Sequence, residues 1–146
     1  MSDSDAALAA LYQPRIRDHA ARVRADRRLA TPDVTVTCRS PVCGSMLTLD
    51  LLFQGDRLAQ IGWKARACTL GMASLGIVTR AGIGQTESQI AEVGRQLSAM
   101  LEGETVAFPD PWGELDLFCA ARSFPTRFGS ILLPFQAIAQ GFAEAN

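Results

Sequence analysis

Residues 34–66 read VTVTCRSPVCGSMLTLDLLFQGDRLAQIGWKAR and form the part of the sequence that decides the fold. Apolar and polar residues alternate from Val34 to Cys38 and again from Leu47 to Phe53, a period typical of half-buried strands. Gln54-Gly55-Asp56-Arg57 is typical of a turn, and residues 58–66 follow as a return strand. Three consecutive strands joined by short connections predict an antiparallel meander.

Helical spacing of apolar residues surrounds this strand region. The spacing predicts five helical segments: a first helix that breaks or restarts at Pro14, a helix from Leu70 to Gly82, one after the Thr86 and Gln89 capping box that stops at Gly103, a short helix over 112–122, and a last helix over 131–142. Residues 104–111 read as a loop. We therefore expect one α+β domain over residues 1–146, with a three-stranded antiparallel meander and helices packed on one face.

Composition limits the classes of function. The chain has 146 residues, 48% of them hydrophobic, and a formal net charge of −1, which argues against a broad nucleic-acid-binding surface. Six arginines between Arg15 and Arg28 are typical of a solvated helix face, and an acidic protein partner is the alternative. No segment has the apolar length of a membrane span, and no secretory leader pattern opens the sequence. We expect a cytoplasmic protein whose four cysteines are free, metal-bound or transiently modified.

Two cysteines lie in segments that present a thiol. Cys43 lies between Pro41 and Gly44, where proline fixes the approach and glycine lets the backbone turn close to a bound group. Cys68 precedes a predicted helix N-terminus, where unpaired N–H groups and the helix dipole favour a thiolate. The alternatives are a turn cysteine without a role and a buried, inert cysteine.

The other potential ligands have simpler interpretations. Cys38 lies on the apolar face of the first strand and is expected to be a small core residue, with a third thiol near Cys43 as the alternative. Cys119 lies in an apolar helical run and is expected in the core. His19 is the only histidine, lies far from both thiols in sequence, and is expected to be structural.

Four segments recur in order in one known protein family. In chain order they are Leu11-Tyr12 with Ile16 and Asp18-His19; Ser40-Pro41-Val42-Cys43-Gly44-Ser45; Ala67-Cys68-Thr69-Leu70-Gly71-Met72-Ala73-Ser74; and Gly113-Glu114-Leu115-Asp116 followed by Arg122-Ser123-Phe124-Pro125-Thr126-Arg127-Phe128-Gly129-Ser130. Together they resemble the iron–sulfur cluster scaffold family of IscU and the NifU N-terminal domain. The closest pattern is that of the SufU branch, which reads N-P-x-C-G-D, G-C-x-x-S-x-A-S, L-Y-x-x-x-I-x-D-H and G-E-L-E…R-K-F-P-A-R-x-K-C. The resemblance spans nearly the whole chain.

The resemblance also implies a metal site from which this chain departs. The family's site has three cysteines and one aspartate, and the first two cysteines correspond to Cys43 and Cys68. Ser45 stands at the aspartate position and Ser130 at the third cysteine position, whereas Cys119 does not match a ligand position. Neutral serine is a poor ligand for zinc or iron, so we expect a zinc ion or iron–sulfur cluster to be held weakly or not at all.

Three of these positions also have interpretations without a metal. Ser130 could cap the last helix, with Pro134 near that helix's start, and Ser45 could hydrogen-bond within its turn. Arg127 falls at an arginine that the SufU motif places beside the metal site. It would pair there with a thiolate or persulfide, or else be a surface charge at the helix start.

The resemblance implies a non-enzymatic scaffold-like protein that accepts sulfur from a cysteine desulfurase and serves apo iron–sulfur proteins. In the SufU branch the zinc site serves desulfurase activation, so the two substitutions put that role in question. One alternative is a metal-free paralogue that acts as an interaction or regulatory module. Another is a thiol redox protein that cycles a disulfide between Cys43 and Cys68, which requires Cα atoms within about 7 Å.

Overall fold

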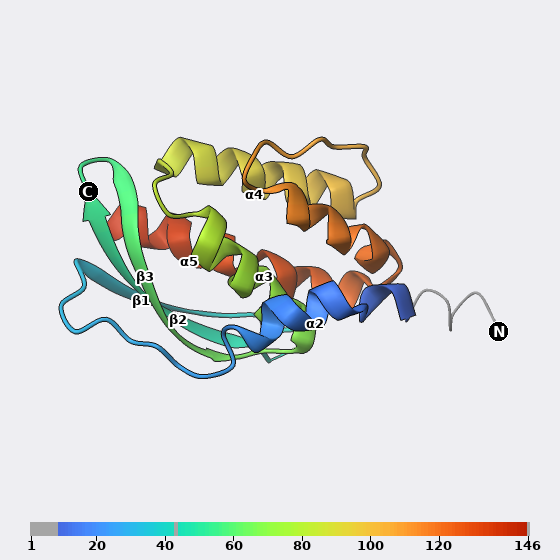
Figure 1. Cartoon of the computed structure of the whole chain (residues 1–146), viewed down its shortest axis with the longest axis horizontal. Helices are drawn as coiled ribbons and strands as arrows, with labels where there is room; N and C mark the ends of the chain where they lie inside the picture. Colours follow the sequence, from blue (N-terminus) through green and yellow to red (C-terminus); the bar gives the residue numbers. More distant parts are fainter. Residues whose placement is uncertain (1–8, 43, 146) are drawn as a thin grey trace.

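The computed structural model describes residues 9–42 and 44–145, which fold as one layer of strands covered by helices (Figure 1). In chain order the elements are α2 (Pro14–Ala21), β1 (Val34–Arg39), β2 (Met46–Gln54), β3 (Arg57–Arg66), α3 (Thr69–Ala81), α4 (Glu87–Leu101), the 3-10 helices η1 (Gly113–Ser123) and η2 (Pro125–Arg127), and α5 (Phe128–Ala145). Pro14 is the first residue of α2, so the predicted helix restart is confirmed.

The sheet is the predicted meander. Its strand order is β1-β2-β3, and both neighbouring pairs are antiparallel. Leu47, Leu49 and Leu51 alternate along β2 and are buried, because they face the helices. Helix α5 packs against β1 and β2, and α2 packs against α3 (Figure 1). The α+β class with helices packed on one face of the sheet is confirmed.

A buried carboxylate lies on the face of the sheet that points away from the helices. Asp50 is 1% exposed and lies between two of the core leucines in sequence, so its side chain points away from the helices. It accepts hydrogen bonds from the Arg28 guanidinium at 2.7 and 3.0 Å, from the Thr35 hydroxyl and from the Leu29 N–H. The Arg28 hydrogen bond, followed by the other donors, lowers the pKa of Asp50 to about 2. This carboxylate therefore anchors the segment between α2 and β1 to the sheet.

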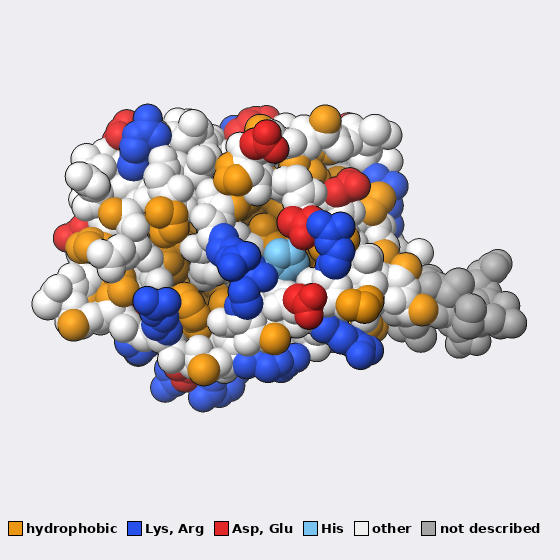
Figure 2. All heavy atoms as spheres, in the orientation of Figure 1, with side chains coloured by type: hydrophobic (Ala, Val, Ile, Leu, Met, Phe, Trp, Pro, Cys, Tyr) orange, Lys and Arg blue, Asp and Glu red, His pale blue; other side chains and the backbone are white. Residues whose placement is uncertain are grey.

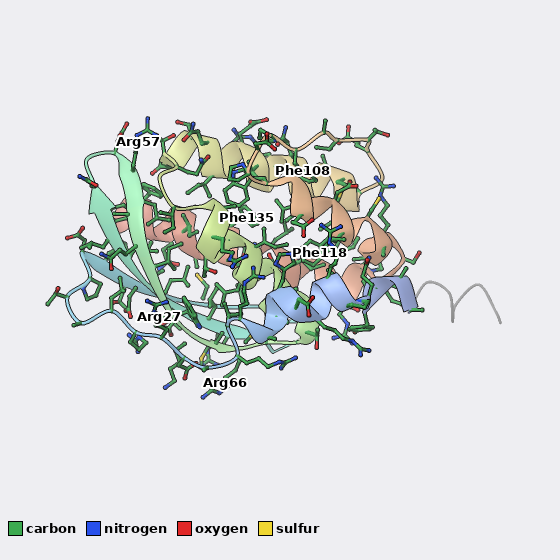
Figure 3. All side chains as sticks on the ribbon, viewed as in Figure 1. Arg27, Arg57, Arg66, Phe108, Phe118 and Phe135 are labelled. Carbon is green, nitrogen blue, oxygen red and sulfur yellow. The ribbon has the colours of Figure 1, made fainter. Side chains whose placement is uncertain are left out.

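The helical half follows the predicted boundaries closely. Thr86 and Gln89 form the expected capping box at the start of α4, and Gly103 has a φ of 111° just after its end. Phe118 and Phe135 point into the space between the helices, and the Phe135 ring lies 5.8 Å from that of Trp112 (Figure 3). No helix in the described ranges has the length and apolar character needed to span a bilayer.

The short helix predicted over 112–122 is confirmed. It is a 3-10 helix, and its buried residues Leu115, Phe118 and Ala121 recur every three residues, the period of that helix.

One helical prediction needs correction. The last helix begins at Phe128, so Ser130 is its third residue and does not cap it. Pro134 lies inside α5, where it removes one ladder hydrogen bond without ending the helix.

Candidate functional site

Backbone hydrogen bonds join Ser40 to residues 44 and 45, on the other side of Cys43 in sequence. The Ser40 N–H donates to the Ser45 carbonyl at 2.8 Å, and the Gly44 N–H donates to the Ser40 carbonyl at 2.9 Å. Gly44 has a φ of 70°, a conformation that glycine adopts without a steric cost. Cys43 itself lies outside the described residues. The turn places Ser45, which is 2% exposed, immediately before β2.

The second thiol lies where the sequence predicts it, at the entrance to a helix. Cys68 is the N-cap of α3, with extended backbone angles, and its carbonyl accepts the N–H of Met72 at 2.9 Å. The side chain is half-buried and makes no capping hydrogen bond. The first N–H groups of α3 therefore open beside this cysteine.

The start of α5 joins these two segments. The hydroxyls of Ser45 and Ser130 lie 2.5 Å apart in a buried hydrogen bond between the turn and α5. A Cβ added at Gly71, in the first turn of α3, would lie only 3.2 Å from the Ser130 Cβ. The Ser74 hydroxyl donates to the Ile131 carbonyl at 2.6 Å, which also fixes α3 on α5. We call the place where Ser45 and Ser130 meet the first turn of α3, which has Cys68 as its N-cap, the serine corner.

The described residues of the serine corner do not fit a four-coordinate zinc site or a cluster site. In the described ranges there is no group of three or more His, Cys, Asp or Glu side chains that could hold a metal ion. The two hydroxyls that the resemblance predicts at ligand positions bond to each other, and neutral hydroxyls are poor ligands for zinc or iron. A hydrogen bond therefore links the turn to α5 at this point.

Relatives of the chain agree with this architecture. No protein-family model matches the sequence. The chain is 25% identical over 92% of its length to the "Iron-sulfur cluster assembly scaffold protein IscU" of Streptococcus pyogenes serotype M1, of which the match covers 84%. It is 24% identical over 96% of its length to the "Zinc-dependent sulfurtransferase SufU" of Bacillus subtilis strain 168, and the match covers 95% of that protein.

Solved structures with the same fold include NifU-like and SUF-system proteins. A NifU-like N-terminal protein from Brucella abortus superposes with a TM-score of 0.89 at 27% identity, covering 95% of this chain and 96% of that one. A SUF-system scaffold protein described as putative, from Fervidobacterium islandicum AW-1, has the same fold, with a TM-score of 0.81 at 21% identity over 92% of this chain and 98% of that one. In both sequence and fold, the chain therefore resembles the IscU/NifU-like scaffold proteins, and a SufU protein is among the relatives that it matches.

Arg127 lies close to the serine corner in sequence. It ends η2, three residues before Ser130, and is half-buried. Its side chain makes no hydrogen bond or ion pair with another described residue. The pairing with a thiolate or persulfide stays a prediction.

Cys38 is tied to the middle of α5. Its thiol donates to the Gln140 side-chain oxygen at 3.1 Å, and the residue is half-buried against the core. Gln140 follows Ser130 by ten residues, about 15 Å along a helix. Burial, and then the charge of Glu144, raises the pKa of the Cys38 thiol. The Cys38 thiol is therefore bonded to α5 at Gln140, while its Cα pairs with that of Leu47, two residues after Ser45.

Cys119 does not enter the serine corner. It lines a surface hollow of 370 Å³ together with Arg15 and Glu114, and it is half-buried. The expectation of a core position is thus only partly met, because one side of η1 faces this hollow.

His19 is structural, as predicted. Its Nε2 lies 3.1 Å from a Glu114 carboxylate oxygen, and the Arg22 guanidinium donates to its Nδ1 at 2.7 Å. Because a guanidinium only donates, Nε2 carries the proton and donates to Glu114. Arg15 also pairs with Glu114, and the hydrogen bonds from Arg15 and then His19 hold the pKa of that carboxyl below its usual range.

Sequence reasoning missed that two of the family-like segments meet at this carboxylate. Asp18-His19 and Gly113-Glu114 are 95 residues apart, and each was recognised only as a separate match. A contact between them could have been predicted from their chemistry, because the first segment offers the hydrogen-bond donor His19 and the second offers the carboxylate of Glu114.

Proposed function

We propose that the chain is a scaffold-like protein of iron–sulfur cluster assembly that accepts sulfur from a cysteine desulfurase at Cys68, with Cys43 as the second thiol. The observation that carries the proposal is the serine corner, where one thiol position at a helix entrance adjoins two hydroxyls. The relative from S. pyogenes is described as a scaffold, and the relative from B. subtilis as a zinc-dependent sulfurtransferase.

The chemical step needs only one accessible thiolate. The Cys68 thiolate attacks the terminal sulfur of a desulfurase persulfide, forms an S–S bond to it and displaces the desulfurase thiolate. One sulfur atom moves, no net oxidation occurs, and the persulfide proton stays with the transferred sulfur or passes to solvent. The half-buried helix entrance supports this role for Cys68 better than the Gln140-bound position supports it for Cys38. Arg127 would stabilise the negative charge of the bound persulfide.

In this proposal the chain binds iron or zinc only weakly, as cargo. Cys43 and Cys68 are two thiolate ligands of a partial site, and Ser45 and Ser130 supply no further strong ligand. The chain then hands sulfur to apo iron–sulfur proteins in the cytoplasm and is not itself an enzyme.

Mass spectrometry after incubation with a cysteine desulfurase and cysteine tests the proposal. We expect a mass gain of one sulfur atom that dithiothreitol removes and that Cys68→Ser abolishes. Cys119→Ser is the matched control and should retain the gain. If neither Cys68 nor Cys43 gains sulfur while the desulfurase is active, the acceptor role is wrong.

A second candidate is a metal-free interaction module of cluster assembly. The Ser45–Ser130 hydrogen bond favours it, because this contact joins the turn to α5 without a metal. Desulfurase binding that survives in the Cys43→Ser/Cys68→Ser double variant, together with no sulfur transfer to the unmodified chain, would support the module.

A further inference from the structure

A basic surface hollow lies at the end of α3 remote from Cys68. It has a volume of 410 Å³ and lies between β3, the end of α3 and the segment after α2. The residues that matter here are Arg22, Arg27, Arg80, Ile61, Trp63 and Ile83. Figure 2 shows basic side chains gathered around apolar atoms on this face, and Figure 3 labels Arg27 on the segment that follows α2. We call this feature the arginine hollow.

The arginine hollow is lined mainly by basic and apolar side chains. No aspartate or glutamate lines it, and the nearest acidic charges on Arg22 are those of Asp18 and Glu114 outside the hollow. The side chains of Arg27 and Arg80 make no hydrogen bond or ion pair with other described residues. Arg22 is held in place by the Gly76 carbonyl at 3.0 Å and by the His19 ring at 2.7 Å. Burial first, and the nearby Arg80 charge second, lowers the pKa of Arg22, which indicates that the two cations repel each other.

The floor of the arginine hollow is apolar and fixed. Ile61 and Trp63 are 7% and 8% exposed and form part of β3. The Trp63 indole N–H donates to the carbonyls of Val23 and Ala25 at 3.1 and 3.0 Å, which attaches the segment after α2 to the sheet. Ile83, at the rim, is 42% exposed, one of two large hydrophobic side chains exposed in the described ranges. An apolar side chain can therefore settle on this floor without rearranging it.

We propose that the arginine hollow is a docking surface for an acidic, apolar-containing segment of a partner protein. Carboxylates of that segment pair with Arg22, Arg27 and Arg80, and a leucine-like side chain covers Trp63 and Ile83. The proposal does not depend on sulfur transfer, because the thirteen residues of α3 separate the hollow from Cys68 by about 20 Å. A nucleic acid is the weaker choice, since the net charge is −1 and the apolar floor offers nothing to a phosphate backbone.

Titration of the ¹⁵N-labelled full chain with a synthetic peptide tests this proposal. The probe is acetyl-Glu-Leu-Asp-Glu-Leu-Glu-amide, and its control replaces each acid by the corresponding amide. We expect the acidic peptide to shift the indole N–H signal of Trp63, whereas that of the fully buried Trp112 stays in place. Arg27→Gln/Arg80→Gln should weaken binding about fivefold or more, because two exposed charge pairs are lost. These two side chains make no internal contacts that folding needs, and Arg95→Gln on α4 is the matched control.

Several results would overturn the proposal. The first is that the acidic peptide leaves the Trp63 signal unshifted, and the second is that the amide peptide binds equally well. Equal shifts with a ten-nucleotide oligoadenylate or with inorganic phosphate at the same charge concentration would replace the acidic segment by a general anion. Unchanged affinity in the Arg27→Gln/Arg80→Gln variant would place the binding elsewhere.

Discussion

The serine corner and the Glu114 contact are both built from family-like segments, but they are held together differently. At Glu114, the carboxylate meets Arg15 and His19, so its charge is balanced within the chain. At the serine corner, two neutral hydroxyls bond to each other and adjoin the Cys68 helix entrance. An aspartate and a third cysteine at those positions would place negative charge there and require a cation, whereas hydroxyls do not.

The two sites also differ in how they join neighbouring segments. The contacts that join α2, α3, η1 and the sheet use balanced charges, close backbone approaches and apolar packing. At the serine corner, a hydrogen bond between two hydroxyls joins the turn to α5. The resemblance to scaffold proteins therefore predicts the architecture of this chain more securely than its metal chemistry.

Restoring the two ligands should give the largest effect. The Ser45→Asp/Ser130→Cys variant should bind zinc more than about 100-fold tighter than the unmodified chain, because even outer-shell changes alter zinc affinity 10- to 100-fold. Competition with a chromogenic chelator measures the affinity. Unchanged affinity would mean that Ser45 and Ser130 are not at ligand positions, which would break the comparison.

Disrupting the close approach of α2 and α3 should give the second-largest effect. A Cβ at Gly76 would collide with the carbonyl group of His19, whose carbon would lie 2.8 Å away. Gly76→Ala should lower the free energy of unfolding by about 3 kcal/mol in urea. Gly113→Ala, where a Cβ meets nothing within 4 Å, is the control and should change little. An unchanged free energy of unfolding in Gly76→Ala would show that α2 and α3 do not need this close approach, and that the contact between His19 and Glu114 does not depend on it.

Removing the charge of Asp50 should give the third-largest effect, and the loss of stability should depend on pH. Its pKa of about 2 lies below the unfolded value, so its contribution is present above about pH 4 and is lost as pH falls towards 2. Asp50→Asn should lower the free energy of unfolding by about 2 kcal/mol at pH 7, and the difference should shrink below pH 4. Urea unfolding across pH 7 to 2.5 measures this, with the exposed Asp56→Asn as control. A difference independent of pH would show that the carboxylate charge is not what stabilises the anchor.

The serine pair should give the smallest effect. A double-mutant cycle with Ser45→Ala and Ser130→Ala should yield a coupling energy of about 1 kcal/mol, the size of one neutral hydrogen bond. Unlike the Asp50 difference, this coupling should not change between pH 5 and pH 8, because neither hydroxyl titrates there. Zero coupling would mean that the 2.5 Å contact contributes nothing to holding the corner together.

Local pattern was sufficient for most of the fold. The alternation at 34–66 and the Thr86 capping box each depend on neighbouring residues, and the structure confirms both. The start of α5 was misjudged because Ser130 and Pro134 are typical of helix starts, whereas packing on β1 and α3 extends the helix backwards to Phe128. The short helix at η1 is also confirmed, and its 3-10 type agrees with the three-residue spacing of its buried residues.

The site was less predictable than the fold. The Cys68 helix entrance could be derived from sequence, but the Ser45–Ser130 hydrogen bond joins residues 85 positions apart and depends on the tertiary structure. The same holds for the contact between His19 and Glu114 and for the bond from Cys38 to Gln140. The role of Cys43 stays a prediction, as do the sulfur-accepting role of Cys68 and the pairing of Arg127.

The metal content of the chain purified without oxygen or chelators tests the central claim most directly. Because hydroxyls stand at two of the four ligand positions, we expect zinc and iron well below one equivalent per chain. We also expect that Cys43→Ala changes this content little. A full equivalent of either metal per chain, lost in Cys43→Ala, would contradict the account.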